Sequence, residues 1–121
     1  MLTDAMRVAR QYGISHRDLS LNNVILGGDL KDYKLIDFGE AKTISDKVES
    51  IPIVGKLAYL PPEIKQLVED LEENKGNVTI DYDPEMADVY SMGIIFASLC
   101  ILDKFDSRDS QEEWSRKLTI L

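Results

Sequence analysis

Cysteine is nearly absent from this chain, which has one, Cys100, among 121 residues. A single cysteine cannot form an internal disulfide, so we expect a reducing compartment and an intracellular, cytoplasmic protein. Cys100 lies in an apolar run, which predicts a buried and unreactive thiol. The N-terminal residues MLTDAMRVARQ also lack the basic start and the uninterrupted apolar stretch of a signal peptide.

Basic residues are in the minority, because the chain has 14 Lys and Arg against 22 Asp and Glu, a formal net charge of −8. This balance argues against a ligand with a phosphate backbone, such as a nucleic acid. At its length the chain supports one modest hydrophobic core.

The most informative stretch is residues 16–39, which read HRDLSLNNVILGGDLKDYKLIDFG. Polar clusters stand at both of its ends. The first is His16-Arg17-Asp18, with Asn23 five residues after the aspartate, and the second is Asp37-Phe38-Gly39. Both clusters border short apolar runs, so they are the first candidates for a functional site.

Apolar residues 24–26 and 35–36 predict two short strands, joined by a turn at the Gly-Gly-Asp sequence between them. Such a hairpin can bring Asp18, Asn23 and Asp37 close together in space. One carboxylate could then orient a hydroxyl nucleophile, while the amide and the other carboxylate offer oxygens to Mg²⁺, a cation that prefers oxygen ligands and substrate phosphates.

These motifs resemble the catalytic loop and the metal-binding loop of eukaryotic protein kinases. The resemblance implies that Asp18 is the base or orienting group for a substrate hydroxyl, and that Asn23 and Asp37 bind Mg²⁺ and ATP. It also implies that Ile25 lies under the adenine and that Arg17 serves regulation, because its charge can pair with a phosphorylated loop. His16, Phe38 and Gly39 are then supporting residues.

The sequence departs from this family at two positions. Many Ser/Thr kinases carry a lysine two residues after the catalytic aspartate, where this chain has Ser20. Residues 55–63, GKLAYLPPE, resemble the segment G-T-x-x-Y-x-A-P-E, but Lys56 replaces the threonine. The hydroxyl and the ammonium look exchanged. We therefore expect Lys56 to reach back to Asp18 and supply the missing cation, the alternative being a solvated lysine in a degenerate site.

The resemblance places the activation segment at residues 37–63. Its hydroxyl residues Thr43, Ser45 and Ser50 are candidate phosphorylation sites, although each is more often a simple loop residue. Ser50 is the nearest to the usual site, and a proline stands closer still. Glu63 normally pairs with an arginine of a late helix that this sequence does not include, so we expect it to be unpaired.

Helical patterns flank these motifs. Residues 3–12 read as an amphipathic helix ended by a glycine, with one face made of Leu2, Ala5, Met6, Ala9 and Tyr12. Residues 64–83 read as an acidic helix-loop insertion with a solvated face.

Residues 84–102 are apolar on all sides after Asp88, which predicts a buried helix and a poor membrane span. Its D-V-Y-S-M-G sequence resembles the start of the central lower-lobe helix in kinases, where Asp88 accepts hydrogen bonds from the backbone near His16 and Arg17. Residues 103–121 are polar again, with Trp114 and Leu118 four residues apart on one predicted helix face.

The resemblance covers nearly the whole chain and implies one partial kinase domain at residues 1–121. The fold class that it implies is α+β, mainly α: part of a kinase-like C-lobe, with a short β-hairpin bearing the catalytic and metal-binding loops. The sequence has no glycine-rich loop, strand lysine or helix glutamate from the upper lobe, and the last lower-lobe helices are not represented.

We therefore expect a Ser/Thr protein kinase that uses ATP and Mg²⁺ on protein hydroxyls, with little activity from these residues alone. Two alternatives stay open: a non-catalytic, pseudokinase-like binding module, and a small-molecule phosphotransferase of the aminoglycoside or choline kinase type. The intact Asp18, Asn23 and Asp37 count against the first alternative, and the P-P-E and D-V-Y-S-M-G motifs count against the second. Apolar lower-lobe surface left uncovered also predicts association with another molecule.

Overall fold

A computed structural model of the chain describes residues 2–29, 32–44, 50–70, 79–101 and 110–119. Its elements follow the order α1 (Leu2–Gln11), β1 (Ile14–Ser15), η1 (Leu21–Asn23), β2 (Val24–Leu26), β3 (Tyr33–Leu35), β4 (Lys42–Thr43), β5 (Ser50–Pro52), η2 (Leu57–Tyr59), α2 (Pro62–Asp70), β6 (Thr79–Asp81), α3 (Pro84–Ile101) and α4 (Gln111–Thr119). The fold is mainly helical with small antiparallel strand pairs, as the sequence predicts.

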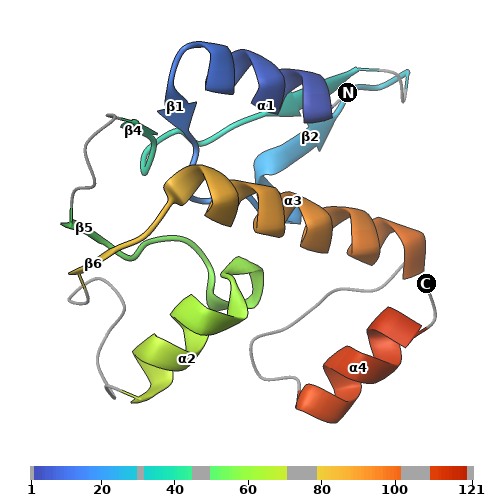
Figure 1. Cartoon of the computed structure of the whole chain (residues 1–121). Coiled ribbons are helices and arrows are strands. Elements are labelled where there is room, and N and C mark those ends of the chain that lie inside the picture. The colour runs from blue at the N-terminus through green and yellow to red at the C-terminus, as the bar shows by residue number, and fades with distance from the viewer. Residues whose placement is uncertain (1, 30–31, 45–49, 71–78, 102–109, 120–121) are drawn as a thin grey trace.

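The long helix α3 runs through the middle of the molecule, with α1 and the β2–β3 strands on one side and α2 and α4 on the other (Figure 1). Asp83 starts this helix, because its Oδ1 accepts hydrogen bonds from the backbone N–H groups of Glu85 and Met86 at 2.9 and 3.2 Å. Pro84 then occupies the first helical position, where a missing N–H is harmless.

The predicted hairpin is present. β2 and β3 pair antiparallel, with Val24 opposite Leu35 and Leu26 opposite Tyr33. One further backbone bond, from the N–H of Ile36 to the carbonyl of Asn23 at 2.9 Å, extends the pairing to the end of the hairpin. The two candidate metal-binding residues, Asn23 and Asp37, therefore sit at the same end of two neighbouring strands.

Two other strand pairs tie the activation segment to the rest of the chain. β4 pairs with β1, the strand just before the catalytic loop (residues 16–23). β5 pairs with β6, so that Ser50, Ile51 and Pro52 lie opposite Asp81, Ile80 and Thr79. The sequence predicts a loop at 79–81, and the structure corrects this to a strand. A partner strand supplies the hydrogen bonds that so short a run cannot provide for itself.

The core has two parts, and the segment that follows β5 contributes residues to both. The first joins α1, the catalytic loop, η2 and α3, and its buried residues are Leu2, Leu19, Ala58, Tyr59, Ile94, Ile95 and Ala97. The second joins the activation segment to α2 and α3, through Ile53, Leu60, Ile64, Val68 and Ala87. Both parts use α3, which is why that helix fixes the positions of the loops around it.

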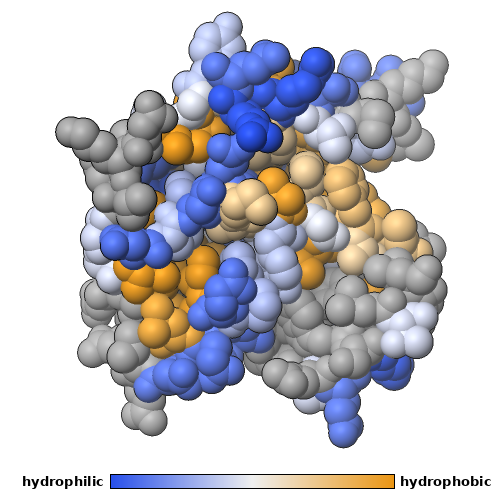
Figure 2. Space-filling model, in the orientation of Figure 1, coloured by the Kyte–Doolittle hydropathy of each residue, from blue (hydrophilic) through white to orange (hydrophobic). Residues whose placement is uncertain are grey.

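α3 is not buried on every side, which corrects the sequence prediction. Met86, Val89, Phe96 and Leu99 expose 61, 49, 38 and 53% of their surface, and the predicted buried thiol of Cys100 is exposed as well. A band of hydrophobic residues accordingly follows α3 across the visible face in Figure 2. Among the described residues no element covers this stripe, so composition alone overstated the burial. We call these four residues the α3 stripe.

α3 is also the one helix in the described part of the chain with the length and composition to cross a membrane, at a mean hydropathy of 1.2. This is weak evidence, because the core helix of a soluble protein passes the same test. Here the helix buries polar Asp88, Ser91 and Ser98 against the rest of the fold, as a core helix does.

Smaller differences concern the ends of the chain. α1 begins and ends one residue before the predicted 3–12, and Tyr12 is 75% exposed instead of packed. Gly13 follows the helix with a φ of 65°, the conformation that a glycine tolerates best. A helix is present at 111–119, started by Ser110, but the side chains of Trp114 and Leu118 lie outside the described residues, as do residues 71–78 and Ser45.

Candidate active site

Asp18 lies at the centre of a small cluster of polar side chains. The amide nitrogen of Asn23 donates hydrogen bonds to the backbone carbonyl of Asp18 at 2.8 Å and to its Oδ2 at 3.1 Å. The side chain of Asp18 is 15% exposed, so the carboxylate is held in place but still reachable from solvent. A carboxylate fixed in this way can accept a hydrogen bond from an incoming hydroxyl.

Lys56 contacts the same carboxylate. Its ammonium lies 3.3 Å from Oδ1 and 3.4 Å from Oδ2 of Asp18, and it donates a third hydrogen bond to the hydroxyl of Ser20 at 3.0 Å. Ser20 is buried, whereas the Lys56 side chain is 42% exposed. The contact that the sequence predicts between Lys56 and Asp18 is thus present, while its part in catalysis stays a prediction.

Asp37 follows β3, at the same end of the hairpin at which Asn23 precedes β2. Its φ is 60°, in the left-handed region, and its Oδ1 accepts a hydrogen bond from the N–H of Gly39 at 3.3 Å. The local bond partly compensates the unfavourable backbone, which aspartate tolerates better than most residues. Asp37 is exposed, so its second carboxylate oxygen can face a ligand.

The residues present fit a magnesium ion that arrives with phosphates. Asn23 turns its nitrogen to Asp18, which leaves its amide oxygen as the group it can offer a cation, and Asp37 offers carboxylate oxygens. Among the described residues no group of three His, Cys, Asp or Glu could hold a metal by itself. Mg²⁺ does not need such a cage, because it keeps waters and takes oxygens from substrate phosphates.

His16 is a structural residue in this geometry. It is fully buried, its Nδ1 accepts the N–H of Asp18 at 3.2 Å, and its Nε2 lies 3.0 Å from the carbonyl of Ile36. The hydrogen-bond network therefore assigns the proton to Nε2. The ring also packs edge-on against Phe38, with centroids 4.7 Å apart. His16 thereby joins the catalytic loop to the Asp-Phe-Gly turn.

The carboxylate of Asp88, on α3, accepts hydrogen bonds from the backbone of the catalytic loop. Its Oδ2 accepts the N–H of His16 at 2.7 Å, and its Oδ1 accepts the N–H of Arg17 at 2.9 Å. Both contacts are the ones that the sequence predicts. Ser15, which sequence reasoning missed, adds a hydroxyl donor to Oδ2 at 2.8 Å. Its only sequence signal is its place directly before the histidine.

Two further supporting residues were missed as well. Ser91 of α3 donates its hydroxyl hydrogen to the carbonyl of Tyr59 at 2.7 Å, and the hydroxyl of Tyr59 lies 3.4 Å from the backbone nitrogen of Leu21, which donates to it. Together they link α3, the end of the activation segment and the catalytic loop. Tyr59 stands in a quoted motif, but nothing in the sequence indicates which group it contacts.

Arg17 contacts the activation segment through main-chain oxygens. Its Nη2 donates to the carbonyl of Pro52 at 2.6 Å and its Nη1 to that of Glu40 at 3.4 Å. Its Nε is buried and has no partner within the described residues. Ile25, the predicted residue under the adenine, is 48% exposed on β2, so its side chain is free to contact a ligand.

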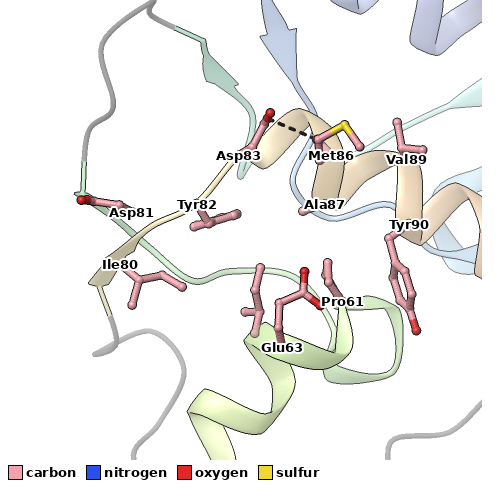
Figure 3. A pocket seen from close by; sticks show the side chains of 11 residues that line it. Pro61, Glu63, Ile80, Asp81, Tyr82, Asp83, Met86, Ala87, Val89 and Tyr90 are labelled. Atoms are coloured by element: carbon pink, nitrogen blue, oxygen red, sulfur yellow. Dashed lines mark hydrogen bonds between the residues drawn. The ribbon is translucent and has the colours of Figure 1, made fainter.

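Glu63 lies away from these residues, in a pocket of about 510 Å³ between α2, β6 and the start of α3. Figure 3 shows it there with Tyr82 and Tyr90. Within the described part of the chain it makes no hydrogen bond or ion pair. Burial, and secondarily the charge of Glu63, raise the pKa of Tyr90 above its ordinary value. The pocket contains none of the residues around Asp18.

Comparison with known proteins shows the family to which the chain belongs. The family model of the protein kinase domain matches residues 1–119. Among curated proteins, the human testis-specific serine/threonine-protein kinase 3 is 33% identical over 111 residues, which cover 89% of this chain and 36% of that protein. The chain therefore belongs to the protein kinase family.

Two yeast proteins are also similar. Serine/threonine-protein kinase KSP1 of Saccharomyces cerevisiae is 33% identical over 98 residues, covering 81% of this chain and 9% of that kinase. The nitrogen permease reactivator protein of the same yeast is 38% identical over 98 residues, covering 77% of this chain and 11% of that protein. The chain thus spans about a third or less of the length of these relatives.

Proposed function

We propose that these residues form the lower-lobe half of a Ser/Thr protein kinase site, which transfers the γ-phosphate of ATP to a protein hydroxyl. One observation supports this above the others: the Asp18 carboxylate is bound by both the Asn23 amide and the Lys56 ammonium. A binding module would not need a carboxylate, a cation and a metal-binding amide in contact.

Each residue has a separate task in this proposal. Asp18 orients the substrate hydroxyl and accepts its proton. Asn23 and Asp37 would hold Mg²⁺, which would supply positive charge against the negative charge that develops on the phosphates. Ile25 packs under the adenine.

Lys56 is the cation next to the transferring phosphoryl group, with Ser20 fixing its ammonium at 3.0 Å. Phosphoryl transfer relies on positioning and electrostatics, so a displaced lysine can serve as well as one on the catalytic loop. A degenerate site with a solvated lysine would leave that ammonium without these partners. The three contacts of Lys56 therefore favour the exchange.

Other clamps of the phosphates, the glycine-rich loop and the strand lysine, do not occur in the sequence. We therefore expect these 121 residues alone to bind ATP weakly and to transfer phosphate poorly. Binding is the property to measure first, since it needs only the half-site.

The test is calorimetric titration of the chain with ATP, with and without Mg²⁺. We expect weak binding that needs Mg²⁺ and is lost in Asp37→Ala. Asp32→Ala is the matched control, because it removes the same charge from an exposed position in the β2–β3 turn. A chain that is folded by circular dichroism and binds no ATP would contradict the proposal and favour a non-catalytic binding module.

A further inference from the structure

Lys56 is part of the activation segment, so its position at Asp18 depends on how that segment is held. In a site that relies on a lysine of the catalytic loop, the cation and the carboxylate share one rigid turn. Here they are 38 residues apart in sequence. Whatever anchors the activation segment therefore also decides whether the Asp18–Lys56 pair forms.

The first anchor is Arg17. Its guanidinium donates to the carbonyls of Pro52 and Glu40, at 2.6 and 3.4 Å, and so joins both halves of the segment to the catalytic loop. The residue that faces the guanidinium is a proline, which has no hydroxyl to phosphorylate. The Nε of Arg17 is buried, so a phosphate arriving from solvent cannot reach it without rearrangement.

The second anchor is the strand pair β5–β6. It is reinforced by two isoleucines of the segment that point into the protein, because Ile51 is 4% exposed and Ile53 is fully buried. β6 follows α2 and precedes α3 in the sequence. The partner strand of the activation segment therefore comes from the same chain. Ser50, the nearest candidate phosphorylation site, lies directly opposite Asp81. A phosphate on Ser50 would face a carboxylate, and like charges in that position destabilise a strand pair.

The two anchors lead to Lys56 over a short and constrained path. Gly55, with a φ of 90°, packs directly against the backbone of Arg17, where an added Cβ would meet the carbonyl oxygen at 2.7 Å. Lys56 follows at once, and its ammonium reaches Asp18 and Ser20. The segment from Pro52 to Lys56 thus has contacts at both ends and in its middle.

We propose that Arg17 and strand β6 are positioning elements that hold Lys56 at Asp18 through main-chain contacts, so that no phosphate on the activation segment is needed. This rests on the proposed function, in which Asp18 and Lys56 act together on the transferring phosphoryl group. In this arrangement the guanidinium of Arg17 binds carbonyl oxygens of the chain itself and not a phosphate. Phosphorylation of Ser50 opposes the arrangement instead of completing it.

The test measures the reactivity of the Lys56 amine toward an acylating reagent by mass spectrometry, relative to Lys34 in the same molecule. Arg17→Met keeps an unbranched, flexible stem and removes all the hydrogen-bond donors of the guanidinium. Arg17 has a φ of 67°, a conformation that is unfavourable for arginine and methionine alike. We expect Lys56 to react about two- to fivefold faster, as when an exposed ion pair is lost. Arg7→Met on α1 is the matched control and leaves Lys56 unchanged.

A second pair of variants keeps the proposal testable if Arg17→Met does not fold. In a Cys100→Ser background, Ser50→Cys with Asp81→Cys places two thiols at directly opposite strand positions, which a disulfide can bridge. We expect the oxidised form to protect Lys56 more than the reduced form does. In the Arg17→Met chain the disulfide should restore most of the lost protection, which a merely structural role of Arg17 would not explain.

Three results would overturn the proposal. One is unchanged Lys56 reactivity in a folded Arg17→Met chain, and another is equal reactivity of the oxidised and reduced disulfide variants. The third is protection of Lys56 only in chains that carry a phosphate on Thr43, Ser45 or Ser50. The labelling needs no nucleotide, so it is independent of the proposed function. A chain that binds no ATP while Lys56 remains protected from acylation would contradict the proposed function. It would not contradict the anchoring of Lys56.

Discussion

At the scale of single residues, Asp88 supports the backbone of the catalytic loop although it is not one of the proposed reacting groups. One buried carboxylate accepts two backbone N–H groups of the catalytic loop and one serine hydroxyl. The loop includes Arg17, whose φ of 67° is unfavourable for a residue with a side chain. Asp88 stabilises that conformation, and the loop conformation in turn sets the direction of Asp18.

Replacing Asp88 should therefore destabilise the fold. Asp88→Ala leaves buried donors of residues 15–17 unsatisfied, and we expect a loss of about 2–5 kcal/mol in the free energy of unfolding, measured with urea. The free energy of unfolding of Asp88→Asn should lie between those of the wild type and Asp88→Ala, because the asparagine amide nitrogen is a donor and would face one of the backbone N–H groups. The control, Asp70→Asn at an exposed position of α2, should change stability by less than about 0.5 kcal/mol. Equal effects of the two Asn variants would contradict this role.

Gly55 is the second residue that the site cannot replace. A Cβ at this position would lie 2.7 Å from the carbonyl oxygen of Arg17, and the φ of 90° is strained for any other residue. We expect Gly55→Ala to cost about 1–3 kcal/mol in thermal or urea unfolding. Gly28→Ala is the matched control, since nothing lies within 4 Å of its added Cβ. If both variants unfold alike, the close approach of the two loops is not as described.

At the scale of elements, the contacts of Asp88 with the catalytic loop span 72 and 71 residues of sequence, and only the family resemblance implies them. The sequence itself predicts the hairpin and the helices. Local patterns suffice for these, because alternation, turn residues and motif spacing are short-range signals. The strand pair β5–β6 could not be predicted in this way. β6 has three residues, and its partner lies 27 to 31 residues earlier in the chain. Nothing local identifies such a pairing.

The burial of α3 shows the opposite limit. Its sequence is apolar on all sides, so composition predicts burial all round, but burial depends on which elements pack against it. The structure covers the face with Ala87, Ser91 and Ile95 and leaves the α3 stripe open. An exposed apolar stripe is a surface on which proteins associate.

We expect the chain to self-associate through the α3 stripe at high concentration. The variant Val89→Gln with Leu99→Gln should reduce association in analytical ultracentrifugation. It should not weaken the helix, since glutamine favours helices more than valine does and about as much as leucine does. Val8→Gln on α1 is the control, because Val8 is 47% exposed and Val89 is 49% exposed. A wild-type chain that stays monomeric at all concentrations would contradict the expectation.

At the scale of the whole molecule, the fold separates support from chemistry. The two parts of the core and α3 hold the catalytic loop and the activation segment together, and polar groups from both segments contact Asp18. The pocket at Glu63 and Tyr90 is lined by other residues and includes none of these contacts. The proposed function therefore requires that a nucleotide with its metal bind at the hairpin end and not in that pocket.

The most direct test of this claim is an NMR titration with ATP and Mn²⁺, a paramagnetic ion in place of Mg²⁺. Binding at the proposed site should broaden the amide signals of Asn23, Asp37 and Gly39 and leave those of Tyr82 and Tyr90 sharp. The same titration of Asp37→Ala should show no selective broadening. Broadening centred on residues 81–83, or none in a folded chain, would contradict a phosphotransfer site built around Asp18.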